Sequence, residues 1–164
     1  MSMYIGTKQI AAIPMNRLDY NTYRGWELPK DEDGTDEGYL VEYLDGGQSN
    51  HHNHNGYVSW SPKATFEASY NCVYTGVSLG QAVDLMKNGA YKVARKGWNG
   101  KGMFLYYVPA NAYPAATPAA KKEFGENGLV PYSAYIAMKT ATGEVVPWLA
   151  SQTDLLADDW VLVD

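Results

Sequence analysis

The residues best suited to binding chemistry lie between positions 92 and 104, where cationic, aromatic and glycine residues alternate. The run reads Lys-Val-Ala-Arg-Lys-Gly-Trp-Asn-Gly-Lys-Gly-Met-Phe and joins two segments of strand-like composition. Basic side chains suit phosphate, and the indole face of Trp98 suits a nucleobase. Gly97, Gly100 and Gly102 would let backbone amides come close to a ligand. The pattern predicts a nucleotide-binding pocket.

A second aromatic stretch, Val145–Asp154, follows later in the chain. Trp148 comes directly after Pro147 at the end of a predicted strand. The amides of residues 151–153 open a predicted helix, and helix N-termini attract phosphate groups. Trp98 is not expected to anchor the core, because the polar residues around it need water. On the residues alone, the alternative that both tryptophans only cover hydrophobic edges or subunit contacts stays open.

Three histidines, His51, His52 and His54, crowd one predicted loop. A His-x-His spacing can bind zinc or nickel, but structural zinc sites use four protein ligands, and the single cysteine, Cys72, lies well away. We therefore interpret the loop as a polar connection between two strands and predict no metal.

The sequence carries no recognisable catalytic motif. Cys72 has no histidine nearby, and the serines lie in no nucleophile-elbow pattern. The glycine-rich run has the spacing of neither a phosphate loop nor a dinucleotide fingerprint. Asp154, Asp158 and Asp159 leave paired-carboxylate chemistry open, although Ser151-x-x-Asp154 is typical of a helix N-terminal box. The sequence predicts a protein that is not an enzyme and holds no cofactor.

The charge of the chain is uneven. Its 164 residues carry a net charge of −5, and residues 1–75, with five Lys or Arg and ten Asp or Glu, account for all of it. Residues 87–101 hold five cations and no acid. A local positive potential on an acidic chain suits a small anionic ligand and argues against a DNA or RNA polymer as partner. Five tryptophans and fourteen tyrosines favour ligand pockets and subunit interfaces.

Length and composition allow one domain or two small ones. With 46% hydrophobic and 19% charged residues, the chain can form a core. The single cysteine permits no intrachain disulfide and fits a reducing compartment. No apolar run approaches the length of a membrane span, and the N-terminus lacks the apolar region of a signal peptide. We expect a soluble protein of the cytoplasm.

The elements that position these residues are expected in two segments, residues 1–75 and 76–164. The first is acidic and rich in turns. It is predicted to contain a helix that Asn16 caps and that runs through Tyr23, strands over residues 38–44 and 56–60, and a helix from Ser61-Pro62 to about Tyr70.

The second segment is expected to begin with a helix, for which Ser78 and Gln81 form a capping box and Asn88-Gly89 marks the end. The apolar face of this helix is predicted to hold Leu79, Ala82, Val83 and Met86. Strands are expected near residues 91–96, 103–108, 134–140, 143–149 and 160–163, with a hairpin turn at Thr142-Gly143.

Residues 109–131, with four prolines, are expected to form a long connection that contains a short helix near 118–124. One helix followed by a mostly antiparallel sheet is typical of an α+β fold. The prediction is a small N-terminal α+β segment followed by a one-helix, mostly antiparallel β-sheet domain.

Residues 78–164 closely resemble a phage family known as the second type of Thoeris anti-defence protein. The matching sequence motifs are Ala82-x3-Met86-Lys-x-Gly89, Val93–Phe104, Tyr135–Thr140, Val146–Asp154 and Asp159-Trp160. They occur in the right order over most of this segment. Relative to short members of the family, the chain has a longer stretch at Pro109–Pro131 and carries residues 1–75 in front, which resemble a phage accessory domain of unknown role.

The resemblance implies a non-enzymatic sponge that binds glyco-cyclic ADP-ribose, a signal made by bacterial TIR-domain enzymes, inside the infected host. It also implies a homotetramer with ligand pockets at subunit interfaces. Some members hold cyclic dinucleotides of CBASS defence in separate pockets. A sponge needs tight binding and slow release and gains nothing from stabilising a transition state.

Within this scheme each candidate residue has an expected role. Trp98 and Trp148 would stack on the adenine, and Arg95, Lys96 or Lys101 would meet the pyrophosphate. Alternation along its strand also allows Arg95 a structural place. The remaining expected ligand-binding residues are Asn99 and Asp154, for base and ribose, and Pro147, Ser151, Gln152 and Thr153 beside them.

Two other functions stay open. One is a protein-interaction module that binds a host or virion protein through its aromatic surface, which the acidic N-terminal segment favours for that half of the chain. The other is a hydrolase that acts on cyclic nucleotides.

Overall fold

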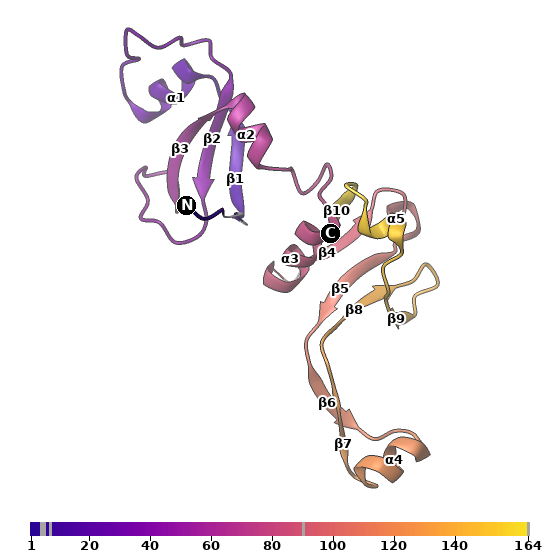
Figure 1. Ribbon diagram of the computed structural model, residues 1–164. Coiled ribbons are helices and arrows are strands. Elements are labelled where there is room, and N and C mark those ends of the chain that lie inside the picture. The colour runs from indigo at the N-terminus through magenta and orange to yellow at the C-terminus, as the bar shows by residue number, and fades with distance from the viewer. Residues whose placement is uncertain (4–5, 7, 90, 164) are drawn as a thin grey trace. The chain divides into compact units, whose positions relative to one another are not determined.

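The computed structural model describes residues 1–3, 6, 8–89 and 91–163, and describes the backbone but not the side chain of Asn99. The chain forms two compact units, Met1–Tyr70 and Asn71–Asp164 (Figure 1). Each unit combines helices with antiparallel strands, so the predicted α+β class is confirmed. No described helix is long and apolar enough to cross a membrane.

The first unit is a three-stranded antiparallel sheet of order β1-β2-β3 with two short helices. Tyr20, Leu40 and Val58 form its buried centre. Asn16 caps the first helix as predicted, because its side chain accepts a hydrogen bond from the Asp19 amide at 2.8 Å. The elements are β1 (Ile10–Pro14), α1 (Arg17–Arg24), β2 (Gly38–Tyr43), β3 (Tyr57–Pro62) and α2 (Lys63–Ser69).

Two details of this unit differ from the sequence prediction. Helix α2 starts at Lys63 without a side-chain cap, because Ser61 and Pro62 belong to β3, where they pair with Tyr39 and Gly38. Sheet pairing therefore overrides the local helix-start signal. Strand β1 was not predicted, and it forms because β2 offers it a complete antiparallel ladder.

The second unit contains a five-stranded antiparallel sheet of order β10-β4-β5-β8-β9. Helix α3 packs against β4, β5 and β10 (Figure 1). The strands of this sheet are β4 (Lys92–Arg95), β5 (Phe104–Val108), β8 (Tyr135–Lys139), β9 (Val145–Pro147) and β10 (Trp160–Val163), and the helices beside it are α3 (Leu79–Gly89), the single 3-10 turn η1 (Asn99–Lys101) and α5 (Gln152–Leu155).

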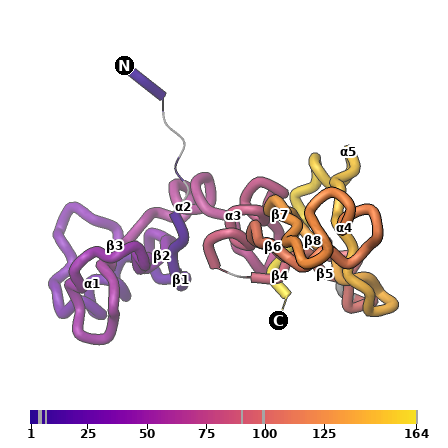
Figure 2. The backbone as a smooth tube through the Cα atoms, turned by 90° about the horizontal axis from the view of Figure 1, so that it is seen from below, coloured from indigo at the N-terminus to yellow at the C-terminus, as the bar shows by residue number. Residues whose placement is uncertain are grey.

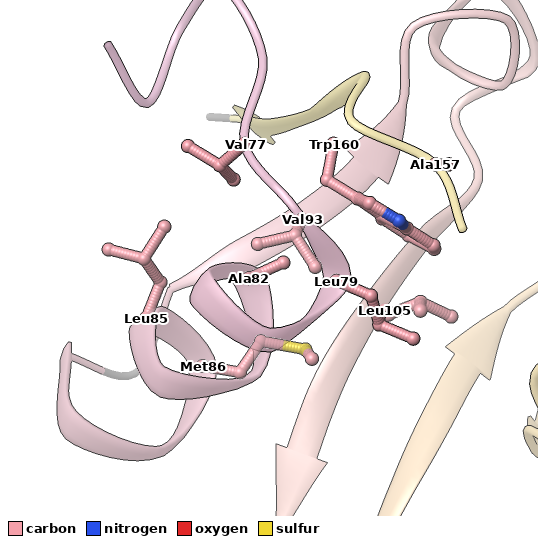
Figure 3. Packing of buried hydrophobic residues seen from close by; sticks show 9 residues of the cluster. All are labelled: Val77, Leu79, Ala82, Leu85, Met86, Val93, Leu105, Ala157 and Trp160. Atoms are coloured by element: carbon pink, nitrogen blue, oxygen red, sulfur yellow. The ribbon is translucent and has the colours of Figure 1, made fainter. Parts of the chain in front are cut away.

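The core of the second unit lies between α3 and the sheet, where one bulky aromatic residue, Trp160, is fully buried (Figure 3). The predicted capping box is present, since the Ser78 amide donates to Gln81 at 3.0 Å and the Gln81 amide donates to the Ser78 hydroxyl at 3.3 Å. Of the predicted apolar face of α3, Leu79, Ala82 and Met86 are buried and Val83 is partly buried, whereas Leu85 is buried without having been predicted. The buried cluster consists of Val77, Leu79, Ala82, Leu85, Met86, Val93, Leu105, Ala157 and Trp160.

Residues 109–131 form a second, two-stranded sheet that extends from the ends of β5 and β8 (Figure 1), and Figure 2 shows its strands with α4 beside them. Strands β6 (Asn111–Pro114) and β7 (Leu129–Tyr132) pair in it, and α4 (Pro118–Phe124) lies at the tip of this hairpin. The short helix was predicted, but the two strands were not, because each has four residues and contains a proline.

Candidate functional site

Three tryptophans meet at the edge of the second unit's core. The ring of Trp98 lies 5.4 Å from that of Trp160, and Trp148 lies 5.8 Å from Trp160, centroid to centroid. Trp98 and Trp148 are 6.4 Å apart, and all three pairs are close to perpendicular. We refer to these three residues as the tryptophan cluster. The sequence prediction that Trp98 and Trp148 belong together is consistent with this arrangement.

The position of Trp98 differs from the prediction in one respect. Its indole is half-buried and packs against the core, although it was not expected to act as a core anchor. The turn after β4 folds back so that the ring covers Trp160 while Lys96 and Lys101 remain exposed on either side. Because the Trp98 and Trp148 rings stand at 77° to each other, a base cannot lie flat between both within one chain.

Arg95 is held by two carboxylates beside the cluster. Its guanidinium donates to Asp159 and, at 3.0 Å, to Asp154, and it also reaches the Thr153 carbonyl at 3.3 Å. The hydrogen bond to Asp159 and then the pairing with Asp154 raise the pKa of Arg95. The guanidinium also lies 5.7 Å from the centre of the Trp160 ring. Arg95 therefore takes the structural place that alternation along its strand allows, and its contact with pyrophosphate stays a prediction.

Asp154 belongs to the start of α5. Its carboxylate accepts from the Ser151 amide at 3.1 Å and from the Ser151 hydroxyl at 2.6 Å, and the Asp154 amide donates back to that hydroxyl at 3.2 Å. Burial alone would raise the pKa of Asp154, but these bonds and the contact with Arg95 together lower it. The predicted capping box is confirmed. These partners engage the Asp154 carboxylate within the chain, and its contact with a ribose stays a prediction.

The other residues predicted around α5 are exposed. Ser151, Gln152 and Thr153 lie on the surface, and the hydroxyls of Ser151 and Thr153 are 2.8 Å apart. Pro147 is also exposed, as the last residue of β9. The structure thus brings Trp148 and the start of α5 to the same region as Arg95, through the ion pair with Asp154.

The turn over residues 96–102 carries two exposed cations. The side chains of Lys96 and Lys101 are exposed, whereas the side chain of Asn99 lies outside the described residues. Of the three glycines, Gly102 alone has a positive φ, 63°. A Cβ added at Gly97 or Gly100 would meet nothing within 4 Å, so the surface beside these two residues is open.

Sequence reasoning missed one cation of this region, Lys139 on β8. Its ammonium donates to the Gly102 carbonyl at 3.1 Å and to the Thr140 carbonyl at 3.4 Å. The contact fixes the end of the turn. The only sequence signal was the motif Tyr135–Thr140, in which Lys139 lies, because no spacing in the chain connects β8 with the turn.

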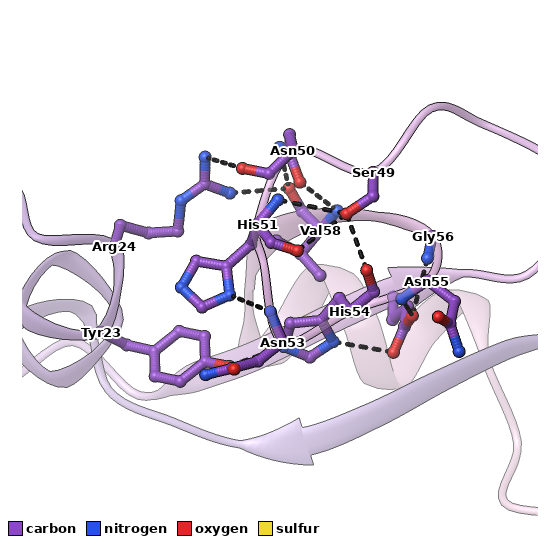
Figure 4. A network of polar contacts seen from close by, with 11 residues as sticks. Tyr23, Arg24, Ser49, Asn50, His51, Asn53, His54, Asn55, Gly56 and Val58 are labelled. Carbon is purple, nitrogen blue, oxygen red and sulfur yellow. Dashed lines mark hydrogen bonds and ion pairs between the residues drawn. The ribbon is translucent and has the colours of Figure 1, made fainter.

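The histidine loop belongs to the first unit, and its rings have protein partners (Figure 4). His54 Nδ1 lies 2.8 Å from a Glu42 carboxylate oxygen, and His54 Nε2 lies 2.8 Å from the Tyr23 hydroxyl. The His51 ring stacks on Tyr23 with 4.5 Å between the centroids. Within the described residues, no group of three or more His, Cys, Asp or Glu is arranged to hold a metal ion.

An exposed apolar patch lies along β9 and the segment that follows it. Leu149 is 92% exposed and Leu156 is 79% exposed, and β9 is an edge strand of the sheet. Large apolar side chains in this position are typical of a surface that another protein covers. The patch consists of Val145, Val146, Leu149, Leu155 and Leu156.

The second unit is thus a small α+β domain in which half-buried tryptophans and exposed lysines lie at one open turn. Residues 77–163 match the Thoeris anti-defense 2-like domain family. Because the match spans more than half of the chain, the chain belongs to this family. It is also 39% identical to Thoeris anti-defense 2 of Bacillus phage SP01 over 90 residues, which are 54% of this chain and 97% of the phage protein.

The β6–β7 hairpin over Pro109–Pro131 lies within the matched residues 77–163, and its greater length relative to short members of the family stays a prediction. The first unit lies outside the family match.

Proposed function

We propose that the chain is a phage anti-defence protein that binds cyclic nucleotide immune signals, above all glyco-cyclic ADP-ribose, and holds them without cleavage. The observation that carries this proposal is the open 96–102 turn, where exposed Lys96 and Lys101 flank half-buried Trp98 inside the family domain. A ligand with a purine and a pyrophosphate uses both features, a flat apolar ring and nearby cations. Bound signal would not reach the Thoeris effector in the cytoplasm of the infected host.

The proposed roles follow the geometry of the turn. Trp98 or Trp148 stacks on one face of the adenine, since the two rings are perpendicular. Lys96 and Lys101 attract the pyrophosphate, and Arg95 holds α5 in place through Asp154. The open surface beside the glycines of the turn gives the ligand room to approach the backbone.

The second face of the pocket is proposed to come from another subunit. The single chain offers no parallel pair of rings, whereas the exposed patch of β9 and α5 begins directly after Trp148. Covering this patch in a homotetramer would place a neighbouring chain beside the tryptophan cluster. Cyclic dinucleotides of CBASS defence belong to the same proposal as a second ligand class, because they also combine purines with phosphates.

The test distinguishes retention of the ligand from its cleavage. The protein is incubated with glyco-cyclic ADP-ribose, passed through a size filter, heat-denatured, and the released small molecules are identified by mass spectrometry. We expect the ligand to be retained with the protein and released intact. Released product would show a hydrolase, and ligand that passes the filter freely would refute binding.

Two variants extend this assay, one as a test of the site and one as a control. Lys101→Ala should weaken retention modestly and make it less sensitive to salt, because an exposed cation acts on phosphate through screened attraction. His52→Ala, in the first unit, should leave retention unchanged.

A further inference from the structure

The first unit, which the proposed function does not use, contains two adjoining grooves that share Trp60. The smaller one, of about 340 Å³, is lined by aromatic rings, among them Trp26 and Tyr57. We call it the aromatic slot. The larger one, of about 650 Å³, is lined mainly by charged side chains, and we call it the acidic groove. Arg17 lines both.

Trp26 is exposed but fixed in place. The residue is 54% exposed, although the Tyr20 and Trp26 rings pack edge to face with 6.3 Å between their centroids and the Arg24 guanidinium lies 4.4 Å from the centre of the indole. Arg24 also donates to the carbonyls of Asn50 at 3.2 Å and Val58 at 3.4 Å, which ties the indole to β3 (Figure 4). A large aromatic side chain that is held in water by several contacts is typical of a recognition surface.

Hydrogen bonds also fix the other walls of the aromatic slot. The Asn50 side chain exchanges two hydrogen bonds with the Val58 backbone, at 2.9 and 2.8 Å. Tyr57, 47% exposed, follows directly after the loop that Glu42 and His54 anchor. Because these groups are ordered by folding, a ligand would not bear the entropic cost of ordering them.

The acidic groove carries an excess of negative charge. Its two cations, Arg17 and Lys63, are already paired with Glu32 and Glu37. Asp36 and Glu67 also line it, so the groove has four carboxylates against two cations. The unit as a whole supplies the net charge of −5 of the chain. This potential attracts a cationic side chain and repels phosphate.

From these contacts we propose that the first unit binds an extended, proline-rich segment of another protein that also carries arginine or lysine. The rigid proline rings would lie against Trp26 and Tyr57 in the aromatic slot, and the basic side chain would enter the acidic groove. A proline-rich segment suits such a surface because it is already extended when free and loses little entropy on binding. The Trp60 ring already packs 4.6 Å from the Arg17 guanidinium, which shows that this aromatic surface accepts such a group.

The experiment uses the full chain and follows its tryptophan indole N–H signals by NMR. The probe is a short synthetic peptide with two Pro-x-x-Pro repeats followed by two arginines. We expect the Trp26 signal to shift with a Kd of about 10–100 μM, while the signals of Trp98, Trp148 and Trp160 stay in place. The same peptide with glutamates in place of the arginines should bind at least about tenfold more weakly.

Variants locate the site. Trp26→Ala and Tyr57→Ala should each weaken binding at least about tenfold, whereas Leu44→Ala, an equally exposed apolar residue outside both grooves, should not. The double variant Asp36→Asn and Glu67→Gln keeps the shape of the groove and should weaken binding of the basic peptide alone. It tests the proposal even if an aromatic variant does not fold.

Four results would overturn the proposal. The first is no shift of Trp26 up to ~1 mM peptide, a limit that corresponds to negligible affinity. The second is equal binding of a peptide with alanine in place of proline. The third is a change of oligomer mass in Trp26→Ala, which would mean that a second copy covers the slot. The fourth is a shift of Trp26 caused by a short single-stranded DNA instead of the peptide. None of these results bears on retention of the cyclic nucleotide.

Discussion

Replacement of Arg95 by alanine separates a structural cation from a ligand-binding one. The substitution removes the ion pair with Asp154, in which the two side chains are 22% and 14% exposed, and the one with Asp159, which is 38% exposed. A hydrogen bond to a charged, partly buried group contributes about 1.5–3 kcal/mol. The more exposed contact with Asp159 adds at most about 1 kcal/mol, because solvent screens it. We therefore expect Arg95→Ala to lower the free energy of unfolding by about 2–3 kcal/mol.

The loss should be visible as a lower Tm of the second unit. For a domain of this size, 1 kcal/mol corresponds to about 4–8 °C, so the transition should fall by about 8–24 °C in differential scanning calorimetry at neutral pH. Lys101→Ala, which removes an exposed cation of the same turn, should change the transition by less than about 2 °C.

Ligand titration of the same variant completes the test. Well below its lowered Tm, the Arg95→Ala protein should keep most of its affinity for glyco-cyclic ADP-ribose, because the exposed lysines of the turn remain. An unchanged Tm together with lost affinity would refute the reasoning. That result would show that Arg95 leaves its carboxylates to meet the ligand.

Three further predictions concern the same site. Trp98→Ala should weaken ligand binding by about tenfold to a hundredfold in calorimetric titration, through the lost stacking surface, and should also lower stability by about 2 kcal/mol because the ring is half-buried against Trp160. Gly100→Ala should leave the Tm unchanged or slightly higher, because the added Cβ meets nothing within 4 Å, but it should weaken binding of a ligand that lies against the turn. Gly80→Ala, on α3 and away from the turn, is the matched control and should leave binding unchanged. The partners that lower the pKa of Asp154 stabilise the folded chain while its carboxylate is ionised. This contribution is present above pH 4 and is lost as the pH falls through the folded-state pKa. In an acid titration, the Tm of Asp154→Asn should therefore fall less below pH 4 than that of the natural chain.

The elements that were predicted correctly have strong local signals. Helix α3 has a capping box at Ser78, an apolar face and a glycine at its end, and all three act within a few residues of each other. Strand β10 was predicted with its observed bounds, Trp160–Val163. The turn at Thr142-Gly143 is also present, with Gly143 at a φ of 104°. In these cases the local preference and the tertiary packing favour the same conformation.

The errors arose where distant residues decide the outcome. Trp98 was expected in water because its sequence neighbours are polar, but Trp160, far along the chain, supplies the apolar partner that draws the ring inward. For Arg95 the residues alone left a ligand contact and a structural place open, because its two carboxylates lie about sixty residues away and reach it only through β10 and α5. Composition near a residue indicates its solvent preference, whereas its actual partners depend on the topology of the sheet.

The same reasoning supports the proposal that the binding site is completed by a second subunit. The core contacts of Trp98 and Trp148 are satisfied within the chain, and the Arg95 charge is balanced there too. Among the residues that stay exposed in the second unit are Leu149, Leu155 and Leu156 and the two lysines of the turn, Lys96 and Lys101. Apolar surface favours contact with another protein, and free cations favour an anion. A neighbouring subunit and an anionic nucleotide would meet these two needs at adjacent places, which is why assembly and ligand retention should be measured on the same preparation.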